Sequence, residues 1–449
     1  MSRQNKMATM PMGRLVLDMS LPMMISLLIQ SLYNIVDSIF VARISEHALT
    51  ATSLAYPVQM LMISVGVGSA VGLNAVLSKA LGAKKEQEAS EIAATGVLLS
   101  VFWGLLFGII GLLFAGRIAH AFTANAEIAE ACQSYLWICM VFALGNIVCM
   151  TYQRLMQATG KTMLSMVILV AGAVTNLVLD PIMIFGLLGC PAMGIKGAAY
   201  ATVIGQWVSM FVGFFLQARY NKDVHVTFKN FKLNMNHVLA IYKIGLPTIV
   251  TQAMQSMMVT CFNAILQPFS TTAVAFFGVY YKLQTFLFMP MNGLGQAAIP
   301  IAGYNFGARN KERIKEIVKV IYPAAIVLAL CGTALFCILP KNLLSLFSAS
   351  AEMLEIGVPA IRIIAPTFAL ASVTVISGYL ASGLQDGVTN MLSAFIRQFV
   401  PLIPCAWLFG KSGGAGMVWY AFWIAEICGI LFALLRIRSI FKQKVDTIQ

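Results

Sequence analysis

Long apolar stretches alternate with short polar segments along the whole chain. Twelve stretches approach or exceed the roughly 20 mostly apolar residues that cross a bilayer as a helix. They lie at about 17–41, 52–78, 92–116, 134–156, 164–186, 195–217, 241–264, 274–300, 319–339, 358–380, 391–409 and 414–436. The pattern predicts an all-α polytopic membrane protein with twelve transmembrane helices. Because twelve is even, both termini are expected on one side of the membrane.

Composition agrees with this class. Of the 449 residues, 59% are hydrophobic and 10% are charged, whereas soluble domains carry roughly 25% charged residues. The nine cysteines show no CxxC or Cys/His spacing, so disulfides and zinc are not expected. A phosphate-binding GxxxxGK[ST] loop is also missing from the sequence. We therefore expect no cofactor and no ATP-driven step.

The basic residues are distributed unevenly between the two sets of loops. If the N-terminus is cytoplasmic, 22 of the 30 Lys and Arg residues fall in cytoplasmic segments and five in outer segments. Such a bias marks the cytoplasmic side. It predicts a bacterial cytoplasmic (inner) membrane protein with both termini inside. It also accounts for the net charge of +13 without a nucleic-acid partner.

The chain repeats itself at an offset of 225 residues. The shift aligns Leu21-Pro22 with Leu246-Pro247, Gln30-Ser31 with Gln255-Ser256, Ser45 with Ser270, Gln59 with Gln284, Gly68 with Gly293 and Gly82-Ala83 with Gly307-Ala308. We predict two six-helix bundles, 1–218 and 237–449, joined by a cytoplasmic linker at 219–236. Six spans preserve orientation, so the bundles are related by a pseudo-two-fold axis along the membrane normal. This layout is typical of alternating-access transporters.

The first span carries a carboxylate, Asp37, where a charge costs about 2.5–3.5 kcal/mol. Helical spacing places Asn34, Tyr33 and Gln30 on or near the same face. We expect these residues to line a substrate path. Pro22, early in the span, removes a backbone hydrogen bond and is the predicted hinge.

The fifth span carries a second acid, Asp180, four residues after Asn176 and hence on the same helical face. If Asp37 and Asp180 share a cavity, their repulsion makes the pair a proton carrier. With Asn176 and a hydroxyl of Tyr135 or Thr202, the same oxygens could instead hold Na⁺. A purely structural alternative is that Asp180 caps a helix broken at Pro181, while Asp37 hydrogen-bonds a neighbouring span.

The second half differs at these positions, with Phe262 in place of Asp37. Its expected path-lining residues are Gln255, Met258 and Tyr281. Glu426, inside the last span, either takes part in coupling or pairs with Arg397 or Lys282.

Taken together, these motifs resemble those of the multidrug and toxic compound extrusion (MATE) family, in the branch that includes DinF and MepA. The resemblance rests on Pro22 and Asp37 with Gln30 between them, GAKKEQEA, TNLVLDPIMIFG, GIKGAAYAT and GYNFGARNKERIKE. It implies a monomeric transporter, not an enzyme, that exports bulky, often cationic amphiphiles by proton or sodium antiport. It further implies cation coupling at Asp37, Asp180, Asn176, Tyr135 and Thr202, with bending at Pro22.

Two other functions compete with this one. The first is flipping of a lipid-linked precursor, known in the same superfamily, although such chains usually add two spans and a cationic cavity. The second is an intramembrane aspartyl protease with Asp37 and Asp180 as its dyad. That chemistry needs YD and GxGD motifs, which YNIVD and LVLDP do not supply.

Overall fold

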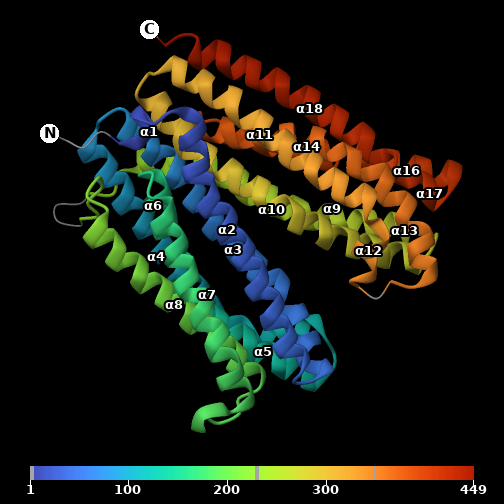
Figure 1. Ribbon diagram of the computed structural model, residues 1–449. Coiled ribbons are helices and arrows are strands. Elements are labelled where there is room, and N and C mark those ends of the chain that lie inside the picture. The colour runs from blue at the N-terminus through green and yellow to red at the C-terminus, as the bar shows by residue number, and fades with distance from the viewer. Residues whose placement is uncertain (1–4, 228–231, 348, 449) are drawn as a thin grey trace. The chain divides into compact units, whose positions relative to one another are not determined.

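The computed structural model describes residues 5–227, 232–347 and 349–448, so part of the predicted linker, 228–231, lies outside the described residues. The described chain is helical and contains no strand. Its first half comprises α1 (Lys6–Thr9), α2 (Met12–Ala42), α3 (Glu46–Gly82), α4 (Glu86–Phe122), α5 (Ala126–Val141), α6 (Ala143–Ala158), α7 (Thr162–Phe185), the short η1 (Leu187–Gly189) and α8 (Ile195–Tyr220) (Figure 1).

The second half follows the same order. It comprises α9 (Met235–Leu266), α10 (Thr271–Gly307), α11 (Lys311–Ile338), α12 (Pro340–Ser345), α13 (Ala351–Ile364), η2 (Ala365–Thr367), α14 (Phe368–Gly383), α15 (Gly387–Gln398), α16 (Leu402–Gly413), α17 (Ala415–Val418), α18 (Ala421–Ile440) and the π-helical η3 (Phe441–Val445).

Each of the twelve predicted spans falls on one helix or on one run of consecutive helices, in the predicted order. Ten helical segments among the described residues are long and apolar enough to cross a membrane, and the pair α5–α6, bent by 48°, makes an eleventh. The remaining prediction, 274–300, falls on the 37-residue helix α10. The sequence did not predict the bend at Phe142 between α5 and α6, because the apolar stretch runs through it without proline.

The structure extends the 225-residue repeat to hydrogen bonds. Ser45 and Ser270 cap α3 and α10 with their side chains. At the ends of these helices, Lys84 and Arg309 adopt the left-handed conformation at φ 58° and 54°. The three amides of each turn donate to equivalent carbonyls, from Ala83 to Lys79 in one half and from Ala308 to Tyr304 in the other. The halves therefore share one backbone plan.

The described chain separates into two compact units, each described here by itself. Unit 1 comprises residues 1–24 and 247–449, and unit 2 comprises residues 25–246. The boundaries fall inside α2 and α9, beside Pro22 and Pro247. The predicted division into bundles 1–218 and 237–449, joined by a linker at 219–236, stays a prediction.

Two glycines explain why the first part of α2 falls in unit 1 and the first part of α9 falls in unit 2, apart from the rest of each helix. In unit 1, Gly293 of α10 lets the backbone of Met24 approach so closely that a Cβ would lie 2.7 Å from its nitrogen. In unit 2, a Cβ on Gly72 of α3 would collide with the carbonyl oxygen of Ile241. Contacts this close are possible only for glycine.

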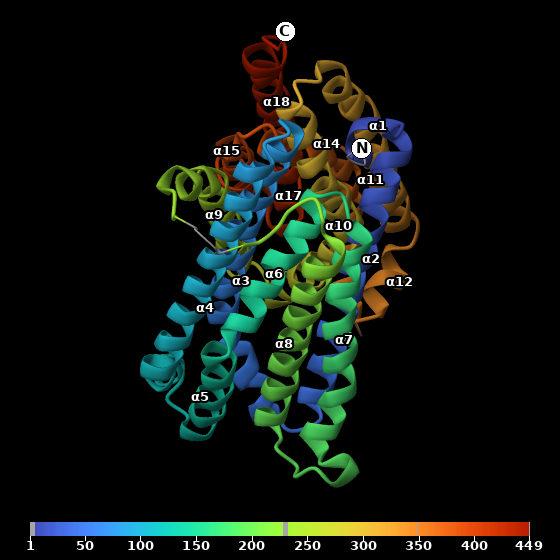
Figure 2. The same cartoon turned by 90° about the vertical axis from the view of Figure 1, so that its left-hand side faces the viewer.

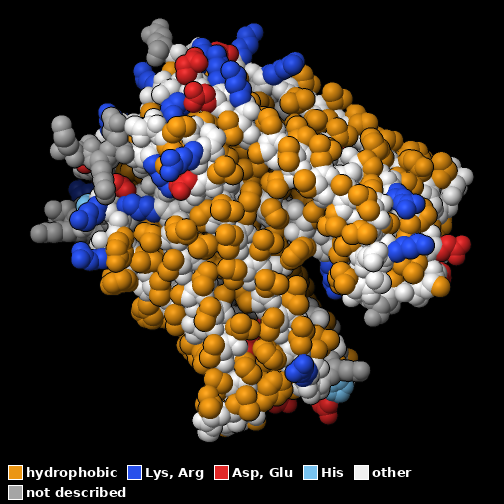
Figure 3. Space-filling model, in the orientation of Figure 1, with side chains coloured by type: hydrophobic (Ala, Val, Ile, Leu, Met, Phe, Trp, Pro, Cys, Tyr) orange, Lys and Arg blue, Asp and Glu red, His pale blue; other side chains and the backbone are white. Residues whose placement is uncertain are grey.

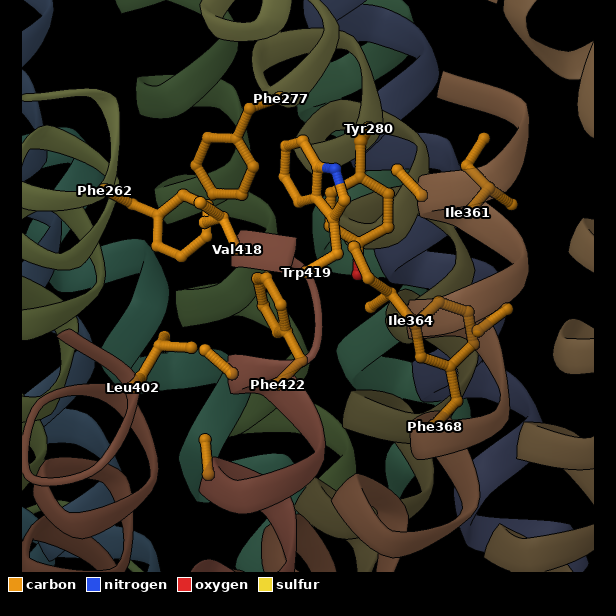
Figure 4. Packing of buried hydrophobic residues seen from close by; sticks show 14 of the residues in the cluster. Phe262, Phe277, Tyr280, Ile361, Ile364, Phe368, Leu402, Val418, Trp419 and Phe422 are labelled. Atoms are coloured by element: carbon orange, nitrogen blue, oxygen red, sulfur yellow. The ribbon is translucent and has the colours of Figure 1, made fainter. Parts of the chain in front are cut away.

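Within unit 2, α7 packs along α8, and α4 packs along α5 and α6 (Figure 2). Within unit 1, α14 packs against α10, α11, α15 and α18. An aromatic cluster of Phe262, Phe277, Tyr280, Trp419 and Phe422 fills part of the core of unit 1 (Figure 4). Hydrophobic side chains cover the sides of the helices, and charged side chains gather near helix ends (Figure 3). This distribution is expected for helices that span a bilayer.

Candidate functional site

Unit 2 brings together the carboxylates of α2 and α7 in one buried polar cluster. The amide nitrogen of Asn176 donates to Asp180 Oδ1 at 3.1 Å and lies 3.4 Å from Thr202 Oγ1 on α8. Asp180 is fully buried and Asn176 is 4% exposed. The carboxyl groups of Asp37 and Asp180 are close enough to interact directly. We call Asp37, Asn176, Asp180, Tyr135 and Thr202 the acidic cluster.

Tyr135 joins the cluster from α5. Its side chain is 5% exposed and interacts with Asp37. Gln59 of α3 lies behind it, with its amide nitrogen 3.4 Å from the Tyr135 hydroxyl and 3.6 Å from the sulfur of Cys139. Sequence reasoning missed Gln59 as a member of the site. Its signal was its match with Gln284 in the repeat, which pointed to the position but not to its role.

The polar stripe of α2 leads away from the acidic cluster. Tyr33 interacts with the Gln30 side chain and with Asp37. Gln30 and Tyr33 are half-buried, and Asn34 is exposed. Gln30, Tyr33 and Asp37 are therefore neighbours in unit 2, as helical spacing predicts. Whether a substrate follows it stays a prediction.

Three buried oxygens in the acidic cluster have no hydrogen-bond partner, namely Asp37 Oδ1, Asn176 Oδ1 and Asp180 Oδ2. Buried polar atoms in folded proteins almost always have a partner. Unpaired oxygens on two adjacent carboxylates favour binding of a proton, which removes one charge, or of a cation, which neutralises it. The arrangement therefore fits an exchangeable positive charge.

The structural alternative for Asp180 is wrong. α7 continues through Pro181 to Phe185, so Asp180 lies inside the helix rather than at a break. Its carboxylate accepts from Asn176 one turn earlier and faces Asp37. α7 ends about one turn after Pro181, at Gly186 in the left-handed conformation.

The predicted path residues of the second half lie in unit 1. Gln255 is exposed, whereas Met258 is 8% exposed and packs in the apolar core with Phe262. Tyr281 is half-buried against the same core, its ring 6.3 Å from that of Phe277. Met258 thus contributes to packing within unit 1. Glu426 forms an ion pair with Arg397 at 2.8 Å, which is one of its two predicted partners. The other predicted partner, Lys282, is exposed.

The decisive comparison is with protein families. The family model MatE matches residues 22–182 and 247–408, which together make up most of the chain. The chain belongs to the MATE family. The two matches begin at Pro22 and Pro247, at the offset of the internal repeat.

Individual MATE relatives match almost the full length. The multidrug export protein MepA of Staphylococcus aureus (strain MRSA252) is 27% identical over 431 residues, which is 95% of this chain and 93% of MepA. A crystal structure of a MATE protein in the straight conformation has a TM-score of 0.91 at 23% identity and covers 99% of this chain and 100% of its own.

A transporter of the MOP superfamily from Pyrococcus furiosus, described as having a binding pocket of reversed polarity that suggests a different function, has a TM-score of 0.89 at 23% identity. It covers 98% of this chain and 99% of its own. The twelve-helix, two-bundle fold, the MATE resemblance and the transporter class are thereby confirmed, and this MATE protein is a multi-pass membrane transporter, not an enzyme.

Proposed function

We propose that this MATE transporter exports structurally diverse, often cationic amphiphilic compounds by proton antiport with alternating access, with Na⁺ as the alternative coupling ion. The observation that carries the proposal is the pair of adjacent carboxylates, Asp37 and Asp180, with unpaired buried oxygens in unit 2. Export of several drugs by the relative MepA supports the substrate class. The protein would lie in a bacterial cytoplasmic membrane with both termini inside.

The proposed cycle couples charge at the acidic cluster to the state of α2. With the outer side open, proton binding by the Asp37–Asp180 pair removes negative charge and weakens attraction to a cationic substrate. The protonated pair makes different hydrogen bonds with the stripe of α2, which bends at Pro22 and releases the substrate. Loss of the proton to the cytoplasm resets the pair. If Na⁺ couples transport, oxygens of Asp37, Asn176 and Asp180 would bind it instead.

Flipping of a lipid-linked precursor remains the second candidate. A pyrophosphate head group would meet two carboxylates in the acidic cluster of unit 2, which repel it. This electrostatic mismatch is why we favour export of cations. The described residues of the cluster include no Lys or Arg to compensate.

The test uses purified full-length protein in proteoliposomes, with ethidium as the probe. Transport is measured under a pH gradient alone and under a Na⁺ gradient alone, for the wild type and Asp37→Asn. We expect the pH gradient to drive ethidium export in the wild type and to have at least a tenfold smaller effect in Asp37→Asn. Export driven by Na⁺ alone would make the cluster a sodium site. If neither gradient moves ethidium or a related cation, the export proposal fails and precursor flipping gains support.

A further inference from the structure

Unit 1 contains a buried ion pair for which the proposed cycle has no use. Arg397 Nε on α15 donates to Glu426 Oε1 on α18 at 2.8 Å. The side chains are 19% and 5% exposed, respectively. One turn earlier on α18, the ring of Phe422 lies 6.2 Å from that of Tyr280.

Only one of the two carboxylate oxygens of Glu426 has a hydrogen-bond partner. The second carboxylate oxygen, Glu426 Oε2, is buried without a hydrogen-bond partner, and so is the hydroxyl of Tyr280, which interacts with both charged groups. A buried ion pair that serves stability alone needs its remaining lone pairs satisfied to repay desolvation. A buried carboxylate oxygen without a partner, such as Glu426 Oε2, is instead a place where a proton can be held.

Arg397 lies at the C-terminal end of α15, next to an interruption in the helical hydrogen bonding: α15 ends at Gln398 and α16 begins at Leu402. The opposite end of α15 is held to α18, where Arg436 pairs with Asp386 at 3.3 Å, so a displacement would concern the C-terminal end. Pro401 supplies no N–H to the carbonyl of Arg397, and Phe399 and Val400 both donate to Phe395. In secondary transporters, discontinuous helices commonly form the substrate and coupling-ion sites.

Separation of the pair would leave Glu426 charged in an apolar core. A buried carboxylate that loses its partner is strongly destabilising, and binding one proton from water at Oε2 removes that charge. The guanidinium keeps its own charge and has the free carbonyls at the end of α15 as acceptors. The charged and titratable groups on the elements packed around Glu426 are Arg397 on α15, Tyr280, Tyr281 and Lys282 on α10, Tyr379 on α14, and Cys405 and Lys411 on α16.

We propose that Glu426 is a second proton-carrying group, which binds a proton when the end of α15 carries Arg397 away from it. This proposal rests on proton-driven export. It assigns to the C-terminal half a proton in addition to that of the acidic cluster of unit 2, and Arg397 controls when that proton binds.

The experiment measures how many protons exchange per substrate. Full-length protein in proteoliposomes, with the membrane potential clamped at zero, is given a pH difference of one unit and an opposing ethidium gradient. The ethidium ratio that stops net flux changes tenfold for each proton exchanged. We expect this balancing ratio to be tenfold smaller in Glu426→Gln than in the wild type. The double variant Arg397→Gln/Glu426→Gln, which leaves no unpaired charge, should give the same reduced ratio and guards against misfolding of the single variant.

The outcomes separate the two proposals. An unchanged balancing ratio in the folded double variant would overturn this proposal alone and make the ion pair structural. A wild type with no balance point under a pH gradient would overturn proton-driven export and this proposal together.

Discussion

The two halves of this MATE protein share a backbone plan but use one position in opposite ways. At Asp37 the first half has a carboxylate that faces Asp180. At the equivalent position, Phe262 is fully buried, its ring 4.5 Å from that of Phe277 and 5.3 Å from that of Phe422. One half therefore keeps buried oxygens unpaired, whereas the other fills the equivalent position with closely packed rings.

This difference separates repeated positions that serve the backbone structure from positions that carry the chemistry of only one half. Capping serines and left-handed turns recur in both halves because each helix end needs its amides and carbonyls satisfied. Charge at the centre of a span recurs only where a partner or function offsets its cost. At this repeat position, unit 1 has a packed aromatic core, whereas unit 2 has a carboxylate that can change its charge.

We expect the largest effect, a loss of folding, from placing a carboxylate in the second half at the position equivalent to Asp37. Phe262→Asp removes a core ring, which alone costs about 3–5 kcal/mol, and places a carboxylate among aromatic side chains. We expect this variant to yield no monodisperse protein in detergent by size-exclusion chromatography. The reverse change, Asp37→Leu, relieves repulsion with Asp180 and should leave a folded protein without coupled transport.

Phe262→Leu is the matched control, because it changes the size of the side chain without adding charge. It should lower the melting temperature by less than Phe262→Asp does, because leucine keeps part of the apolar volume and leaves a smaller cavity. If Phe262→Asp were as stable as Phe262→Leu, the second half would have room for a charge and the contrast between the halves would fail.

The next effect concerns how the acidic cluster holds its charge. Asn176→Leu removes the donor to Asp180, and hydrogen bonds to charged groups are worth about 1.5–3 kcal/mol, or roughly 10–100-fold in rate. We expect pH-driven ethidium export to fall by that amount. Thr202→Val removes only a neutral contact of 3.4 Å and should cost about threefold or less. A larger loss in Thr202→Val than in Asn176→Leu would mean that the hydroxyl, not the amide, organises the cluster.

How far the sequence predicted this architecture depends on the scale of the feature. The spans followed from apolar length, and the meeting of Asn176 with Asp180 followed from helical spacing. The bend at Phe142 and the burial of Met258 depend on packing between helices, which periodicity does not encode. The positions where the compact units divide, beside Pro22 and Pro247, depend on glycine contacts between helices far apart in the chain.

A smaller effect is expected at Gln59, which can be compared directly with its counterpart in the second half, Gln284. Gln59→Leu removes the amide that contacts the Tyr135 hydroxyl at 3.4 Å. A long, neutral hydrogen bond is worth about 0.5–1.5 kcal/mol, so we expect a loss of a few-fold in pH-driven export. Gln284→Leu has no acidic cluster to disturb and should export at the wild-type rate. Equal losses in both variants would show that Gln59 acts through packing alone.

The smallest effect concerns the turns that both halves share. Lys84 and Arg309 adopt left-handed backbone conformations, which cost residues other than glycine about 1–2 kcal/mol. Glycine removes that strain but adds chain entropy to the unfolded state, so Lys84→Gly and Arg309→Gly should each stabilise the protein by about 0.5–1 kcal/mol. Lys84→Ala and Arg309→Ala keep the strain and serve as controls in detergent melting experiments. Because the two turns make equivalent hydrogen bonds, the two glycine variants should shift the melting temperature equally. Unequal shifts would mean that the halves differ in backbone stability as well as in the chemistry of their cores.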